Sequence, residues 1–346
     1  MALFYTLPKL NRGDQVAVLS PSAGLPGLFP WVQDLGLQRL REVFGLEPVE
    51  YPTTRQLRAP LAARAHDVMQ AFANPAHKAV FASIGGSDQL QLLKYLTADV
   101  FLANPKPFFG FSDNTHLHTF LWNLGIPSYY GGAVMTQLAM QGQMHAYTVA
   151  SLSHALFTTG EVEVMAAPHY TDESLEWADP ANLQRTRQLQ ANEGWYWEGK
   201  GEGRGRLWGG CVESLVAQVA AEKYLPTAAA LQDKVLYLET SESLPPAWVV
   251  RYLLLGFGER GWLDHFQAIL VGRPKAWDFA RPLPKEQKAA YCQQQRAVVV
   301  ETVRQYNAHV PIVQNVDFGH TDPQLVLPSG QFARVVGHEQ RLFLTY

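Results

Sequence analysis

Three short segments of the chain carry the residue types of a nucleophilic hydrolase. The first is FFGFSDNT at residues 108–115, in which a short apolar run passes directly into a helical pattern with Ser112 at the junction. A serine at such a turn presents its hydroxyl beside the free backbone N–H groups and the positive dipole end of the helix. Ser112 is therefore a candidate nucleophile, and the N–H of Asp113 is a candidate donor to an oxyanion.

A simpler explanation exists for the same segment. Serine and aspartate are among the residue types preferred at helix N-termini, so Ser112 or Asp113 can act only as a cap. The usual hydrolase elbow also has glycine two residues after the serine, whereas Asn114 stands there. Taken alone, the segment favours capping.

The other two segments supply an acid and a base. The apolar strand KVLYLE at 234–239 ends in Glu239, and DFGHTDP at 317–323 places His320 among turn-forming residues. Each has an alternative, because Glu239 can be a solvated strand end or a helix cap and a lone loop histidine usually has no chemical role. If the segments converge, Ser112 attacks, His320 takes its proton, and Glu239 fixes the imidazole tautomer.

Two glycines complete this set. Gly85 and Gly86 follow the apolar run at 79–84. Glycine lets the backbone approach a ligand closely, so an N–H here is a candidate second oxyanion donor. A simple tight turn explains the pair equally well.

The elements that must position these residues alternate along the first half. Strand-like runs at 15–19, 79–84 and 108–111 are separated by helical patterns at 31–43, 64–72, 90–96 and 115–125. This alternation predicts an α/β fold with a parallel sheet covered by helices.

Beyond residue 165 the pattern changes, so we place a domain boundary between 165 and 205. The glycine-rich 199–210 stretch predicts hairpins or turns, and further strands are expected at 234–239 and 267–271 with helices at 247–260 and 285–306.

Composition excludes several classes of protein. The chain has 346 residues, 28 Lys+Arg against 31 Asp+Glu, and 47% hydrophobic residues, as in a globular protein of two domains. The net charge of −3 gives no basis for binding nucleic acid or anionic lipid. No signal peptide and no span-length apolar run is recognisable, so we expect a cytoplasmic protein in which Cys211 and Cys292 are reduced.

Familiar cofactor and metal motifs are absent from the sequence. It has no phosphate-binding loop, dinucleotide fingerprint or His-Glu-x-x-His. His116 and His118 lie two apart on an expected helix and point to different faces, which makes them poor metal partners. We therefore expect neither a metal nor an organic cofactor.

The motifs together resemble the LD-carboxypeptidase family of serine peptidases. The matching pieces occur in the family's order: GDQVAVLSPSAG at 13–24, ASIGGSDQLQLLKYL at 82–96, NPKPFFGFSDNTHLH at 104–118, GRLWGGCVESL at 205–215, LYLETSE at 236–242, ILVGRP at 269–274 and GHTDPQLVLPSG at 319–330. The family's nucleophile, acid and base then correspond to Ser112, Glu239 and His320. Its oxyanion donors correspond to the backbone of Asp113 and Gly86.

The resemblance also implies an architecture. It indicates an N-terminal α/β nucleophile domain at 1–165, a linker or insertion at 166–204, and a smaller mixed α/β C-terminal domain at 205–346 that carries the acid and base. Homodimers are usual in the family, so a homodimer is expected. Cys211 departs from the family, which commonly has asparagine at this position.

Within the family, the sequence is more similar to the microcin C self-immunity peptidases, which cut the amide joining a peptide or aspartate to a modified nucleotide. The glycine turn at 84–86, with Gly85, and the insertion at 177–197 support this branch. An aromatic residue on a loop stacks the nucleobase there, which makes Trp177, Trp195 and Trp197 candidates. Packing between the domains is an equally good explanation for these tryptophans.

The sequence therefore predicts a serine hydrolase that cuts an amide bond in a small peptide-like substrate, of the peptidyl- or aminoacyl-nucleotide kind. The alternative substrate is a murein tetrapeptide that loses its terminal D-alanine. An esterase with the same triad and a catalytically idle ligand-binding relative also remain open.

Overall fold

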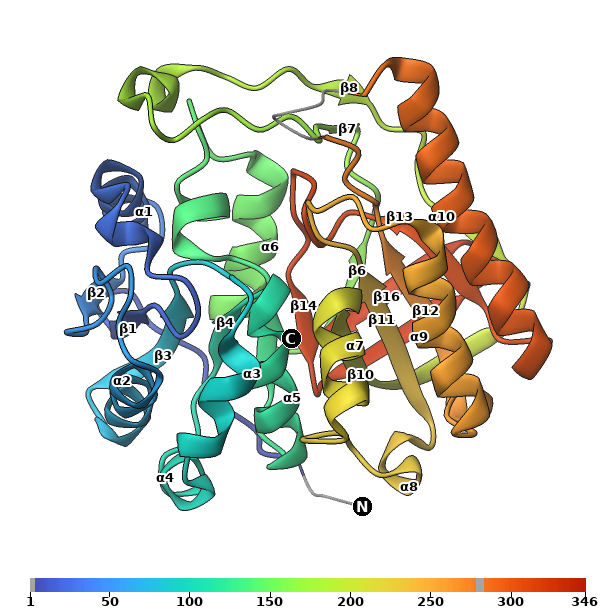
Figure 1. Cartoon of the computed structure of the whole chain (residues 1–346), viewed down its shortest axis with the longest axis horizontal. Helices are drawn as coiled ribbons and strands as arrows, with labels where there is room; N and C mark the ends of the chain where they lie inside the picture. Colours follow the sequence, from blue (N-terminus) through green and yellow to red (C-terminus); the bar gives the residue numbers. More distant parts are fainter. Residues whose placement is uncertain (1–3, 278–282) are drawn as a thin grey trace.

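The computed structural model describes residues 4–277 and 283–346, in which two main β-sheets lie side by side with helices packed around them (Figure 1). The first sheet has the strand order β14-β5-β4-β3-β1-β2. Its members are β1 (Gln15–Leu19), β2 (Glu47–Glu50), β3 (His77–Ala82), β4 (Phe108–Gly110), β5 (Ser128–Tyr130) and β14 (Leu327–Ser329). β1 to β5 are parallel and β14 pairs antiparallel with β5, which confirms the predicted parallel sheet.

Helices cover both faces of the first sheet, as a parallel sheet requires. These helices are α1 (Pro30–Glu42), α2 (Leu61–Ala73), α3 (Gln89–Leu92), α4 (Ala98–Ala103), α5 (Thr115–Asn123) and α6 (Ala146–Phe157). Side chains alternate along β1, so that Val16 and Val18 share a core with α1 and α6, while Ala17 and Leu19 share one with α2 and α5. β1 is therefore apolar on both faces.

The second sheet is mixed, with the order β6-β16-β15-β10-β11-β12-β13-β9. Its members are β6 (Glu161–Val164), β9 (Tyr196–Glu198), β10 (Glu202–Cys211), β11 (Lys234–Glu239), β12 (Phe266–Gly272), β13 (Ile312–Val316), β15 (Phe332–Val336) and β16 (Arg341–Thr345). The central strands β10 to β13 are parallel. The helices of this half are α7 (Val212–Ala221), α8 (Ala228–Leu231), α9 (Ala247–Glu259) and α10 (Lys285–Tyr306).

One apolar core joins the two sheets. Leu236 and Leu238 of β11 pack with α9 and α10, whereas Val235 and Tyr237 on its other face belong to a cluster that includes Phe109 of β4. The sheets also exchange strands, since β6 precedes residue 165 yet pairs with β16, and β14 pairs with β5. Sheet membership therefore does not change at a single point, and the domain limits of 1–165, 166–204 and 205–346 stay a prediction.

The glycine-rich stretch differs from our expectation. Residues 202–211 form the long strand β10 near the middle of the second sheet, and only the short connection from β9 is a turn. A Cβ on Gly209, whose φ is +151°, would lie 1.8 Å from the carbonyl oxygen of Tyr237. The glycines allow close approach of neighbouring backbone, which is a use of glycine that composition alone does not distinguish from turn formation.

The segment between β6 and β9 runs across the top of the molecule in the orientation of Figure 1 and carries the short pair β7 (His169–Tyr170) and β8 (Gln190–Ala191). It extends from the helices of the first sheet towards α10. No helix within residues 4–277 and 283–346 has the length and apolar character needed to cross a membrane.

Candidate active site

Ser112 occupies a strained turn between β4 and α5. Its φ is +64°, in the left-handed region that serine rarely adopts, and its backbone N–H donates to the hydroxyl of Tyr130 over 3.1 Å. A non-glycine residue in this conformation costs about 1–3 kcal/mol and is retained where the surroundings impose it. The turn has the strand-to-helix form of a nucleophile elbow, which is what the sequence predicts for Ser112.

Asn114 replaces the glycine of the usual elbow and makes bonds that glycine cannot. Its Nδ2 donates to the carbonyl oxygens of Phe111 at 2.9 Å and Ile84 at 3.2 Å, and its Oδ1 accepts from Gln89 at 2.8 Å. The asparagine therefore ties the elbow to the loop after β3, where Gly85 and Gly86 lie.

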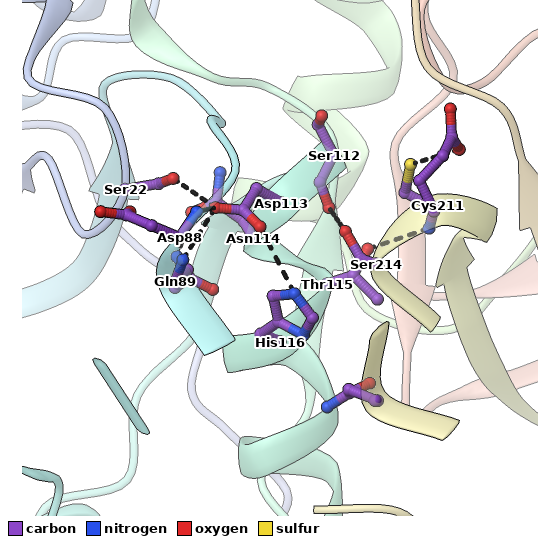
Figure 2. A network of polar contacts seen from close by, with 12 residues as sticks. Ser22, Asp88, Gln89, Ser112, Asp113, Asn114, Thr115, His116, Cys211 and Ser214 are labelled. Carbon is purple, nitrogen blue, oxygen red and sulfur yellow. Dashed lines mark hydrogen bonds and ion pairs between the residues drawn. The ribbon is translucent and has the colours of Figure 1, made fainter. Parts of the chain in front are cut away.

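The capping alternative is contradicted by the contacts of Asp113 (Figure 2). The turn at 112–114 and α5 have no side-chain cap hydrogen bond. Instead, the Asp113 carboxylate accepts from the backbone N–H groups of Asp88 and Gln89, each at 3.0 Å, and also from the hydroxyl of Ser22. It therefore holds the start of α3. Although burial disfavours its charge, the bonds from His116 and Ser22 lower the pKa of Asp113.

Glu239 is not a solvated strand end. Its side chain has no exposed surface, and its Oε2 lies 2.6 Å from Nδ1 of His320. The backbone before His320 also lies close to this carboxylate. A Cβ on Gly319, whose φ is +95°, would lie 2.7 Å from Oε2 of Glu239. The structure thus brings together the acid and the base that the sequence predicts.

Tyr130, at the end of β5, is a site residue that our sequence analysis missed. Its hydroxyl donates to Oε1 of Glu239 over 2.6 Å while it accepts from the N–H of Ser112. Burial, reinforced by the Glu239 charge, raises the pKa of Tyr130 well above its ordinary value, so the phenol stays protonated. One hydroxyl therefore connects the elbow to the carboxylate.

His320 is bounded by carboxylates on both sides of its ring. Besides Glu239 on Nδ1, Oε2 of Glu242 lies 2.9 Å from Nε2, and the ring packs edge-on to Phe111 with centroids 4.9 Å apart. Burial alone would lower the pKa of His320, but the two carboxylates raise it to about 10. In this arrangement the imidazole is protonated and both nitrogens are donors.

The glycine turn lies against the elbow. A Cβ on Gly85 would be 2.9 Å from Cβ of Ser112, 3.1 Å from its Oγ and 3.4 Å from the backbone nitrogen of Asp113. A Cβ on Gly86 would be 2.2 Å from Oγ of Ser22. Neither position has room for a side chain, because Gly85 lies directly against Ser112 and Gly86 lies against Ser22.

A cavity of about 750 Å³ opens over these groups, a volume in the range of small-molecule sites. Of the predicted residues, it is lined by Ser112, His320, Gly85, Gly86 and Trp177. Its walls also include residues that our sequence analysis did not single out as site residues: Phe29, Phe111, Arg187, Glu242, Lys275, Trp277 and Asp322.

Trp195 and Trp197 do not line this cavity. Nε1 of Trp195 donates to Asp317 over 2.8 Å, Trp197 sits on β9 opposite Val313, and both rings pack on the core shared by the two sheets. For these two residues the packing alternative is the one the structure supports. Trp177 differs, because it comes from the segment that crosses the top of the molecule and packs against Phe29 with ring centroids 5.8 Å apart.

Charged groups in the cavity wall are partly paired. Arg187 lies 2.9 Å from the carboxylate of Asp322, and Nζ of the buried Lys275 donates to Oγ of Ser174 over 2.6 Å. Burial and Arg187 together lower the pKa of Lys275. In the part of the chain that the structure describes, no three His, Cys, Asp or Glu side chains gather in a way that could hold a metal.

The remaining residues of interest are structural. Both ring nitrogens of His118 have partners, Oγ of Ser128 at 2.7 Å and the carbonyl of Gly110 at 2.8 Å. Cys211 and Cys292 are free thiols. The Cys211 backbone N–H donates to Oγ1 of Thr115 over 2.9 Å (Figure 2), which anchors the start of α7 to α5.

Comparison with known proteins identifies the family and agrees with this fold. The model of the LD-carboxypeptidase N-terminal domain matches residues 16–131, and that of the LD-carboxypeptidase C-terminal domain matches residues 204–335. The chain therefore belongs to the LD-carboxypeptidase family and is a peptidase. The family predicted from the motifs is confirmed.

The relatives include a microcin immunity protein and a putative carboxypeptidase. The chain is 25% identical over 270 residues to the microcin C7 self-immunity protein MccF of Escherichia coli, covering 77% of this chain and 73% of that protein. It is 26% identical over 336 residues to a putative carboxypeptidase of Treponema pallidum, covering 94% and 90%. An MccF-like protein of Streptococcus pneumoniae, solved in complex with AMP, superposes with a TM-score of 0.84 at 26% identity and covers 96% of this chain and 99% of its own.

Tyr130→Phe is expected to lower kcat/KM for the hydrolysed substrate by about 10- to 100-fold, since a hydrogen bond to a charged group is worth about 1.5–3 kcal/mol. The measurement is steady-state kinetics alongside the thermal midpoint. Tyr129→Phe is the matched control, because the hydroxyl of Tyr129 accepts from Lys9 and does not bond Glu239. Equal activity of the two variants would contradict the role given to Tyr130.

Proposed function

We propose that the protein is a serine peptidase in which Ser112 is the nucleophile, His320 the general base and then acid, and Glu239 the group that orients the imidazole. The observation that carries the proposal is that Ser112, on a strained elbow, lines the same cavity as a histidine whose Nδ1 is held by a buried carboxylate. In serine hydrolases a nucleophile, a base and an acid that orients the base share one site, so this arrangement supports the proposal.

The reaction follows from these positions. His320 accepts the hydroxyl proton as Oγ of Ser112 bonds to the amide carbon, and the backbone N–H groups of Asp113 and Gly86 stabilise the oxyanion. The C–N bond then breaks as His320 gives the proton to the leaving nitrogen. Water then attacks the ester formed with Ser112 while His320 takes its proton. The ester C–O bond breaks, His320 returns the proton to Oγ of Ser112, and the acid is released.

We further propose that the substrate is a peptidyl- or aminoacyl-nucleotide. The similar MccF-like protein of Streptococcus pneumoniae was solved with AMP, and MccF itself was solved with aspartyl sulfamoyl adenosine. Trp177 in the cavity wall offers a π-face to a nucleobase, and the cavity is large enough for a nucleotide.

The second candidate is a carboxypeptidase that removes D-alanine from murein tetrapeptides. Similarity to a probable murein peptide carboxypeptidase of Bacillus subtilis, at 25% identity, favours it.

The homodimer and the cytoplasmic location stay predictions that rest on the resemblance and the composition.

The test is hydrolysis followed by mass spectrometry, with aspartyl sulfamoyl adenosine and a murein tetrapeptide offered separately. We expect release of aspartate by the wild type. Ser112→Ala and His320→Ala should each lower kcat by about 1,000-fold or more, and Glu239→Gln should cost less, while circular dichroism stays unchanged. Near-normal turnover by Ser112→Ala would remove the proposal. Loss of D-alanine from the tetrapeptide alone would assign the second candidate instead.

Trp177→Leu is expected to raise KM for the nucleotide substrate about tenfold, because stacking of a base is worth about 1–3 kcal/mol. Trp248→Leu is the control, since Trp248 is 57% exposed on α9 and does not line the cavity. Steady-state kinetics on the same substrate compares them. An unchanged KM in Trp177→Leu would contradict base stacking at this residue.

A further inference from the structure

The two carboxylates on His320 differ in what holds them. Glu239 is fully buried and receives a second hydrogen bond from Tyr130. Glu242 lies three residues further on, with a side chain that is 60% exposed. The first contact is part of the protein interior, whereas the second can break by rotation of a side chain into solvent.

The Glu242 carboxylate contacts the imidazole nitrogen that the reaction needs. Because Nδ1 of His320 is bonded to Glu239, proton transfer from Ser112 must use Nε2, and this atom lies 2.9 Å from Glu242. An imidazole that donates from both nitrogens carries no lone pair for a proton. While Glu242 is bonded to Nε2, Ser112 is therefore not activated.

The surrounding charges keep this contact closed. Glu239 and Glu242 both face His320 from β11 and the loop after it, and both favour the imidazolium. Lys275, from the loop after β12, favours the charged form of Glu242, and Arg187 in the cavity wall is paired with Asp322. The apolar ring of Phe111, beside Ser112, supplies no competing charge.

We propose that Glu242 is a displaceable carboxylate that holds Nε2 of His320 in the substrate-free enzyme, so that Ser112 becomes reactive only after Glu242 has moved away. The inference rests on the proposed function of Ser112 and His320. Because Glu242 lines the same cavity as these residues, a substrate that enters the cavity meets it directly. Until Glu242 is displaced, the contact keeps Ser112 from being activated.

Glu242→Gln tests this inference through the pH dependence of kcat/KM. Since kcat/KM rises as free His320 loses its proton, and the Glu242 charge raises the pKa of His320, the inflection should shift to lower pH in the variant. A shift of about one pH unit raises kcat/KM at pH 7 about tenfold. Glu301→Gln, an equal change of charge at an exposed position on α10, should leave the profile unchanged.

The imidazole can also be measured without turnover. NMR titration of the histidine resonances, with the His320 signal assigned by its loss in His320→Gln, should give a lower pKa in Glu242→Gln than in the wild type. A lowered pKa supports the inference even if neither substrate is hydrolysed, which separates it from failure of the proposed function. An unchanged His320 pKa, or a uniform fall of kcat/KM at every pH, would overturn it.

Discussion

The buried carboxylate of Glu239 is the constraint on which the rest of the site depends. A buried charge is tolerated only when it is paired and hydrogen-bonded, and loss of a partner costs about 3–5 kcal/mol. The partners come from different halves of the fold: Tyr130 ends a strand of the first sheet, and His320 follows a strand of the second. Tyr130 also accepts from the N–H of Ser112. Glu239 thus orients the imidazole directly and the Ser112 elbow through Tyr130. Both contacts require that the two sheets are assembled.

Much of the fold could be predicted because local pattern and tertiary environment agree. The strand at 234–239 and the helix at 285–306 occur with the predicted limits. The first is a short run with four apolar residues, including Val235 and Tyr237, that the fold buries. The second begins directly after a proline and has no glycine or proline inside it. The glycines of 202–211 misled the prediction because they are needed where neighbouring strands pass close to β10. The atoms that leave no room for a side chain, such as the carbonyl oxygen of Tyr237, are distant in sequence.

The site residues that stand in the ordered family motifs could be predicted from the sequence, and the others could not. Ser112, Glu239 and His320 each stand in a recognisable segment, and the structure brings Glu239 and His320 into contact across 81 positions. Tyr130 and Glu242 were missed because a tyrosine in an apolar strand and an acidic residue in a loop have ordinary structural explanations. The three tryptophans were equivalent in sequence. Trp177 packs on a small buried cluster, and only the path of its segment across the top brings it to the cavity, whereas the other two pack on the core shared by the two sheets.

The central claim is that Ser112 is a nucleophile activated by His320, and covalent labelling tests it most directly. The protein is treated with a fluorophosphonate at alkaline pH, where the neutral imidazole is most abundant, and is then analysed by intact-mass and peptide-mapping mass spectrometry. We expect a single adduct on Ser112 that is lost in Ser112→Ala and forms much more slowly in His320→Ala. An adduct of the same yield in Ser112→Ala, or a wild-type Ser112 that does not react, would contradict it.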